Sequence, residues 1–128
     1  MKLKYIIIAM TFITHFGIMA QVVKQGEIKL FNDRPYMVIS GNNVNDISDI
    51  ITIIPLIPKS LKLPDQSQVQ DVILVDQNKN ERVASVYLDK ILSENKSNLK
   101  YLNPRQFSSN ESLDETKERL KQILDLGN

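Results

Sequence analysis

Polar and apolar positions alternate over residues 27–31 and then give way to a second, more continuously apolar run at residues 36–40. Between the two runs stand the turn-forming residues Asn-Asp-Arg-Pro, at positions 32–35. Two such runs joined by a short turn predict a β-hairpin. Because the second run is apolar on both faces, we expect it to lie nearer the centre of a sheet than the first.

The next apolar segment, residues 44–58, is compatible with two structures. Its isoleucines at positions 47, 50, 51 and 54 have helical spacing, and Pro55 follows as a stop signal. The β-branched side chains favour a strand over residues 50–54 instead. We favour a short helix over residues 47–54, with the strand as the alternative, and we expect Pro55 and Pro58 to end either element.

Residues 71–76 form the clearest strand, an apolar run between two aspartates, and residues 77–80 form a polar turn. Residues 81–95 follow, with Ala84, Leu88, Ile91 and Leu92 along one helical stripe. We therefore expect a helix over residues 81–95, although residues 83–88 are also compatible with a second hairpin strand.

The C-terminal segment contains an irregular stretch and then a helix. Residues 95–110 are polar, and Pro104 prevents a regular helix through them. Over residues 112–126 the apolar positions share one helical face, Ser112 and Glu115 have capping-box spacing, and Gly127 occupies a C-cap position. The predicted fold is a single small α+β domain over residues 21–128, in which a three- to four-stranded, mostly antiparallel sheet packs against two helices.

Residues 1–20 have the pattern of a cleavable signal peptide. Lys2 and Lys4 precede an apolar stretch, and Ala20 provides a small residue before the expected cleavage site. As a helix, residues 5–20 would reach only about 24 Å, which is short of a bilayer core of roughly 30 Å. We therefore expect export to the periplasm or the extracellular space, with no stable membrane span after cleavage.

The composition of the expected mature chain, residues 21–128, excludes several chemistries. It has no Cys and no Trp, and the one histidine, His15, lies in the signal segment. Disulfides, thiol nucleophiles, Ser-His-Asp relays and zinc sites built on His or Cys are therefore excluded. After removal of Lys2 and Lys4, 14 Lys and Arg face 15 Asp and Glu. This near-neutral balance argues against a nucleic-acid partner.

Carboxylate chemistry remains open, but no pattern of acids defines a site. Asp46 and Asp49 are three positions apart and are better explained by favourable charge at a helix N-terminus. Residues 76–81 resemble a calcium-binding loop only superficially, since the central glycine is missing. We assign no catalytic, metal-binding or cofactor-binding residue, and no cofactor.

These observations favour a non-catalytic accessory protein that binds another envelope or extracellular protein. The candidate contact surface is the apolar run that contains Ile50, Ile53, Ile54, Leu56 and Ile57. The alternatives are a carboxylate-dependent hydrolase acting on glycans, which needs two acids flanking a cleft, and a carrier of small ligands, which needs an apolar cavity.

Overall fold

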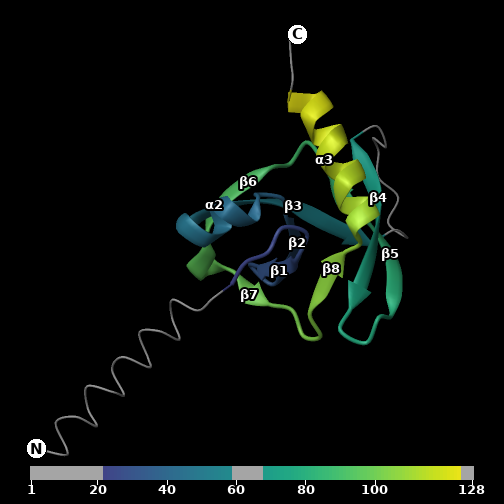
Figure 1. The fold of residues 1–128 in the computed structure, drawn as a ribbon, viewed down its shortest axis with the longest axis horizontal. Coiled ribbons are helices and arrows are strands. Elements are labelled where there is room, and N and C mark those ends of the chain that lie inside the picture. The colour runs from purple at the N-terminus through teal and green to yellow at the C-terminus, as the bar shows by residue number, and fades with distance from the viewer. Residues whose placement is uncertain (1–21, 59–67, 125–128) are drawn as a thin grey trace, which may run out of the picture.

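Eight antiparallel strands and one long helix make up most of the computed structural model, which describes residues 22–58 and 68–124 (Figure 1). The elements are β1 (Ile28–Phe31), β2 (Arg34–Val38), α2 (Asn42–Ile47), β3 (Ile50–Pro58), β4 (Val69–Asp76), β5 (Glu81–Tyr87), β6 (Leu92–Asn95), a 3-10 turn η1 (Lys96–Asn98), β7 (Lys100–Tyr101), β8 (Gln106–Ser108) and α3 (Asn110–Leu124). The strand order is β7-β1-β2-β3-β5-β4-β8, and β6 also pairs with β3. The predicted three- to four-stranded sheet with two packed helices is therefore wrong.

The first hairpin is confirmed. β1 and β2 pair antiparallel, from Ile28 opposite Met37 to Phe31 opposite Arg34. Asn32 and Asp33 form the turn with φ values of 51° and 62°, a left-handed conformation that suits the twist of a two-residue hairpin. β2 lies between β1 and β3, as its continuous apolar run predicts.

The preferred helix over residues 47–54 is wrong, because β3 runs through this segment and continues past Pro55. The Thr52 carbonyl accepts a hydrogen bond from the Ile39 amide on the β2 side. Alternation along the strand therefore directs the nitrogen of Pro55 to the opposite edge. On that edge β3 pairs with β6 only up to Ile53 and with β5 only from Leu56. Pro55 has no N–H to donate, but it lies between the stretch of β3 that pairs with β6 and the stretch that pairs with β5. No hydrogen bond between strands is therefore lost there.

The expected helix over residues 81–95 is also wrong, and the hairpin alternative is correct. β4 and β5 pair in register from Val69 opposite Tyr87 to Val75 opposite Glu81. β5 lies between β3 and β4, and its consecutive residues Ala84, Ser85 and Val86 are all buried. A strand buried on both faces shows no alternation, so its sequence pattern does not distinguish it from a helix.

The C-terminal helix is confirmed, but its predicted cap is wrong. α3 begins at Asn110, and the Ser109 hydroxyl accepts a hydrogen bond from the Ser112 amide at 3.2 Å. The Ser112 hydroxyl accepts instead from the Ile73 amide of β4 at 2.9 Å, so it joins the helix to the sheet. Gly127, the predicted C-cap, lies outside the described residues.

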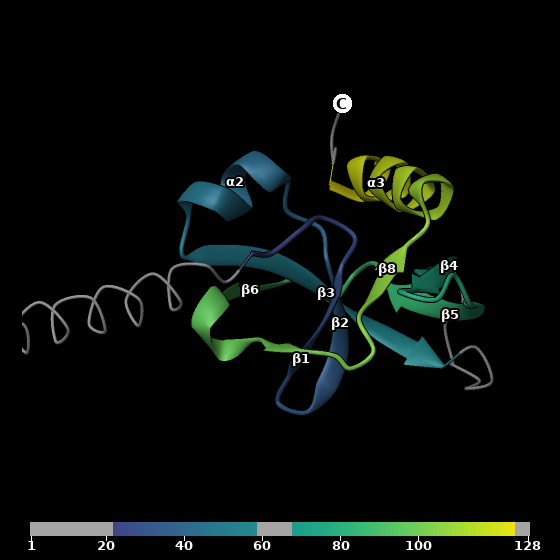
Figure 2. The same ribbon diagram turned by 60° about the horizontal axis from the view of Figure 1, so that its bottom comes forward.

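Two apolar clusters form on the two faces of the sheet. Figure 2 shows α3 lying over β4 and β5, where Leu120 is buried in the larger cluster and Leu113 and Ile123 pack against it. The smaller cluster consists of Val23, Val38, Ile51, Ile53 and Leu99, and Phe31 and Tyr36 pack against it. Among the described residues, no helix is both long enough and apolar enough to cross a membrane.

Candidate functional site

A row of cationic and aromatic side chains crosses the first strands of the sheet. Tyr101 of β7 is in register with Lys29 of β1, which is in register with Tyr36 of β2. Side chains of directly opposed residues lie on the same face of a sheet, so these three residues are neighbours. Phe31 lies on the same face two positions beyond Lys29, and its ring packs edge-on against Tyr36 with centroids 5.8 Å apart.

A buried ion cluster lies beside this row. The Glu27 side chain is buried, and its Oε2 accepts hydrogen bonds from Arg105 Nη2 at 2.7 Å and from Arg105 Nε at 3.1 Å. The same oxygen is 3.7 Å from Lys29 Nζ. Gly26 directs the chain into the cluster: its φ of 87° suits glycine, and its amide donates to the Val38 carbonyl at 2.7 Å. The two cationic side chains, Lys29 and Arg105, thus share the Glu27 carboxylate.

Lys29 is the unusual member of the cluster. Its side chain is fully buried, and Nζ has no hydrogen-bond partner among the described residues. The pKa of Lys29 is lowered from 10.5 to about 8, chiefly by burial; the Glu27 charge opposes this shift and the Arg105 charge adds to it. Near pH 8 a substantial fraction of Lys29 is therefore neutral, and the amine is able both to accept and to donate a proton.

Aromatic rings cover the cations. Lys29 Nζ lies 3.3 Å from the centroid of the Tyr101 ring, and the Arg105 guanidinium lies 5.1 Å from the same ring and 5.2 Å from the Phe107 ring. Tyr101 is 46% exposed, and the Arg105 side chain is 36% exposed. The site therefore offers solvent an aromatic ring and a guanidinium, with an amine directly beneath the ring.

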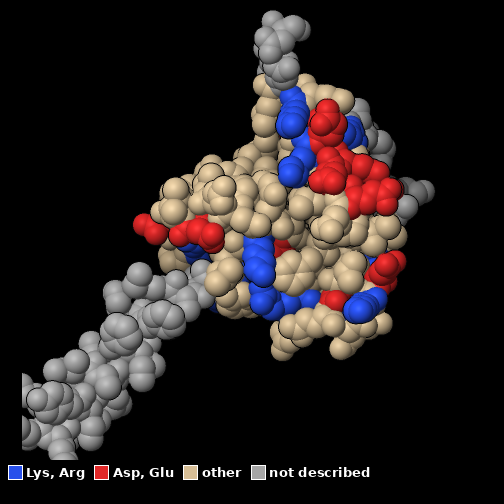
Figure 3. All heavy atoms as spheres, in the orientation of Figure 1, with Lys and Arg blue, Asp and Glu red and all other residues tan. Residues whose placement is uncertain are grey.

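The charges around this site are segregated. In Figure 3 Lys and Arg side chains form a band over the part of the molecule that contains β1 and β7, while acidic side chains gather beside α3 together with further Lys and Arg side chains. Exposed Arg34 begins β2 and exposed Lys100 begins β7, so two further cations belong to the strands of the site. The acids of α3 are Glu111, Asp114, Glu115 and Glu118. A polyanion would therefore meet its most favourable field at the β1–β7 side.

The residues selected from sequence lie elsewhere. Ile53, Ile54 and Leu56 are buried in the apolar clusters, Ile57 is half-buried, and Ile50 is 49% exposed. A partner-binding role for this run stays a prediction, and burial gives three of its members a packing role. Within residues 22–58 and 68–124, no group of three or more His, Cys, Asp or Glu side chains is placed to hold a metal ion.

The cluster residues were missed because the alternation over residues 27–31 was used only to predict a strand. The signal that was present is the spacing of Glu27 and Lys29, which places both on one strand face. Arg105 is 78 positions from Glu27, and no local pattern connects them.

Three kinds of comparison with known proteins were made, and only the comparison of structures finds a likeness, which is one of fold. A comparison with models of protein families finds no match, and neither does a comparison with the sequences of curated proteins. Structural comparison places the chain in a fold that is shared with endoribonucleases of the MazF type.

Three of these structures illustrate the likeness. An endoribonuclease from mycobacterial species has a TM-score of 0.63 at 14% identity, over 84% of this chain and 96% of that one. A mycobacterial endoribonuclease in complex with its cognate antitoxin gives 0.62 at 14% identity, over 83% and 98%. A MazE–MazF crystal structure from Deinococcus radiodurans gives 0.57 at 20% identity, over 83% and 99%.

These likenesses overturn several expectations drawn from the sequence. The neighbours are endoribonucleases. They contradict three expectations: a non-catalytic accessory protein, the absence of enzymatic activity, and an envelope partner in place of a nucleic acid. The charge argument failed because net charge averages over the whole surface and hides the segregation seen in Figure 3. Residues 1–20, the expected signal peptide, lie outside the described residues, and export stays a prediction.

Proposed function

We propose that the protein is an endoribonuclease that holds single-stranded RNA against the β7–β1–β2 face. The observation that carries the proposal is the row of Tyr101, Lys29 and Tyr36, flanked by Arg105, on a fold that endoribonucleases share. Cations interleaved with aromatic rings suit a single-stranded nucleic acid, which offers phosphates and unstacked bases to the same surface.

RNA binding is assigned to the exposed members of the site. The Arg105 guanidinium is held by Glu27 and partly exposed, so it is pre-oriented to bind a phosphate. Arg34 lies on β2, on the same face as Tyr36, and supplies a further phosphate contact. The ring of Tyr101, once it has turned away from Lys29, offers a face on which one base stacks.

Proton transfer is assigned to Lys29. In the proposed step its neutral amine takes the proton of a ribose 2′-hydroxyl, whose oxygen then attacks the adjacent phosphorus. The bond between phosphorus and the 5′-oxygen then breaks, and the 5′-oxygen takes a proton from solvent water, which gives a cyclic phosphate and a free 5′-hydroxyl, while Arg105 stabilises the added negative charge at the phosphate. Tyr101 covers Lys29 and belongs to a strand of only two residues, so the side chain of Tyr101 must turn away as RNA enters.

Cleavage of a labelled single-stranded RNA tests the proposal, with DNA of the same sequence as the substrate control. We expect Arg105→Met and Lys29→Met each to lower the cleavage rate on the order of 100-fold. The wild-type cleavage rate should rise with pH and level off above the lowered pKa of Lys29, which is about 8. This rise should be absent in Lys29→Met.

Lys90→Met serves as the matched control, because Lys90 is exposed and lies against Tyr87, away from the site. Circular dichroism spectra that match those of the wild type establish that each variant folds. Wild-type protein that binds RNA without cutting it would refute the catalytic assignment. Variants that cut as fast as the wild type would refute the location of the site.

A further inference from the structure

A shallow cavity of about 570 Å³, widely open to solvent, lies between α3 and the segment that follows β2, apart from the proposed RNA site. It is lined by Gln25, Ile39, Lys117, Leu120, Lys121 and Leu124. This volume is within the range of about 300–1,000 Å³ that is typical of small-ligand pockets. None of the lining residues belongs to the Glu27–Lys29–Arg105 cluster.

The walls of the cavity are apolar at one end. Ile39 and Leu120 form its base, and Leu124, in the last turn of α3, is 63% exposed. An exposed leucine beside a concave apolar wall gains free energy when an apolar group covers it, by about 25 cal/mol for each Å² removed from water.

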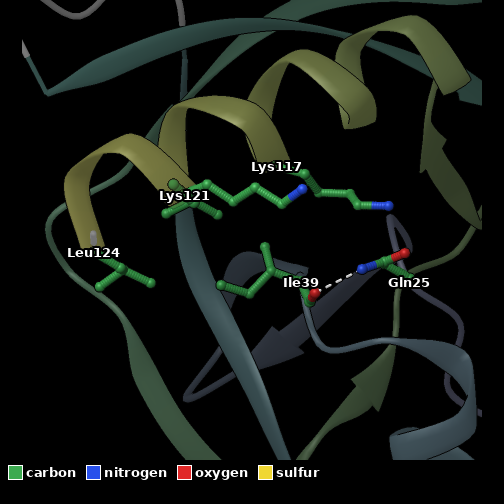
Figure 4. Close-up of a pocket in the computed structure, with 6 residues that line it drawn as sticks. Gln25, Ile39, Lys117, Lys121 and Leu124 are labelled. Atoms are coloured by element: carbon green, nitrogen blue, oxygen red, sulfur yellow. Dashed lines mark hydrogen bonds between the residues drawn. The ribbon is translucent and has the colours of Figure 1, made fainter. Parts of the chain in front are cut away.

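The other end of the cavity is cationic. Lys117 and Lys121 are one helical turn apart, and within residues 22–58 and 68–124 neither side chain forms an ion pair or a hydrogen bond. Figure 4 shows that both side chains run along the helix away from Leu124, and that the Lys117 ammonium extends toward Gln25. The side-chain amide nitrogen of Gln25 donates a hydrogen bond to the Ile39 carbonyl at 2.8 Å, which holds the Gln25 side chain in place at this polar end.

We propose that the cavity binds a free single-chain amphiphile with a carboxylate head. The carboxylate lies between Lys117 and Lys121, and the chain runs over Ile39 and Leu120 to Leu124. A bilayer surface fits less well, because Asp114 and Glu118 of the same helix are exposed and would repel a sheet of anionic head groups. A concave wall with a cationic end and an apolar end matches one molecule that is divided in the same way. This proposal is independent of the RNA-cleaving function.

Calorimetric titration of the purified protein with laurate, below its micelle-forming concentration, tests the proposal. We expect laurate to bind with one-to-one stoichiometry. Acetate, which has the head without the chain, and dodecyltrimethylammonium, which has the chain with the opposite charge, should each bind at least tenfold more weakly. Replacing both lysines, in Lys117→Gln/Lys121→Gln, should weaken laurate binding at least tenfold, and Leu124→Ser should do the same through the chain.

The matched control is Lys90→Gln/Lys100→Gln, which removes the same charge from two exposed lysines outside the cavity and should bind laurate as the wild type does. Equal laurate binding by the Lys117/Lys121 variant would overturn the proposal, as would no binding by the wild type. Binding to phosphatidylglycerol vesicles without laurate binding would assign the surface to a membrane. A dimer that the Lys117/Lys121 variant dissociates, again without laurate binding, would assign it to a second copy of the chain.

Discussion

Lys29 combines properties that a lysine in a folded protein rarely has together. Its ammonium is buried without a hydrogen bond, 3.7 Å from the Glu27 carboxylate and 3.3 Å from the centre of an aromatic ring. Burial of a charge is costly unless the charge is paired, and Glu27 is already bound by Arg105. The neutral amine is therefore favoured in the folded state more than in the unfolded chain.

The pH dependence of stability should reveal this preference. The folded pKa of Lys29 is about 8 and the unfolded value is 10.5, so between these pH values the unfolded chain binds more protons. The free energy of unfolding of the wild type, relative to Lys29→Met, should therefore rise as the pH increases from 8 to 10.5. At about 1.4 kcal/mol for each pKa unit, the rise is about 3 kcal/mol at most. Urea denaturation at pH 7.5, 9 and 10 measures it.

Lys90→Met is the control for this measurement, because Lys90 is exposed. Its stability difference from the wild type should not change over the same pH window. A difference between wild type and Lys29→Met that is also independent of pH would show that Lys29 keeps its ordinary pKa in the folded protein.

At the scale of single elements, the sequence predicted correctly those that depend on local signals, and it did not predict those that depend on distant strands. The β1–β2 hairpin and α3 were predictable because turn residues and helical spacing act over a few positions. β3 and β5 were not, because their identity depends on strands that pair from both sides and bury consecutive residues. Pro55 was interpreted as a stop signal, since the gap between the β6 and β5 ladders is visible only in the assembled sheet.

The candidate site shows the same division. Glu27 and Lys29 were predictable as neighbours on one strand face, because alternation is a local property. Arg105 and Tyr101 were not, since they come from a segment whose sequence predicts only an irregular connection. The low pKa of Lys29 follows from burial beneath Tyr101, and sequence alone does not show which lysine a distant ring covers.

The start of α3 provides a test at this scale. Sequence spacing assigns the cap to Ser112 and Glu115, whereas the structure assigns it to Ser109. Ser109→Ala should lower the free energy of unfolding by about 1 kcal/mol through loss of the cap. Glu115→Ala should change it by less than about 0.5 kcal/mol, because Glu115 is exposed and its carboxylate accepts a hydrogen bond from the Gln70 side chain at the surface.

Chemical denaturation of the two variants measures both values. A larger loss of unfolding free energy for Glu115→Ala than for Ser109→Ala would show that the predicted capping box of Ser112 and Glu115 caps α3. Ser112→Ala is unsuitable for this comparison, because it also leaves the Ile73 amide without its partner.

At the scale of the whole molecule, the distribution of charge matters more than its sum. The formal net charge of the full sequence is only +1, yet cations adjoin the β7–β1–β2 face, and α3 carries four acids beside three cations. A nearly neutral protein is thereby able to present one basic side to a polyanion.

The salt dependence of RNA binding should show how many cations beside the β7–β1–β2 face contact the RNA. If Arg34 and Arg105 each displace a counterion, the logarithm of the binding constant should fall with the logarithm of salt concentration with a slope of about −1.4. Arg105→Met should reduce the slope to about −0.7. Fluorescence anisotropy with a labelled RNA, at several salt concentrations, measures both slopes.

Glu118→Gln, on the acidic helix, is the control and should leave the slope unchanged. An unchanged slope in Arg105→Met, or a reduced one in Glu118→Gln, would place the bound RNA on another part of the surface.

The 78-residue separation between Glu27 and Arg105 has a consequence for the synthesis of the protein. Domains begin to fold while the ribosome is still extending the chain. The first hairpin is complete early, but its carboxylate acquires the guanidinium only after Arg105 has left the exit tunnel. If the site cuts RNA as proposed, a nascent chain has no cutting site until the segment that contains Arg105 has been made. Until then, that nascent chain is unable to cut the messenger from which it is being translated.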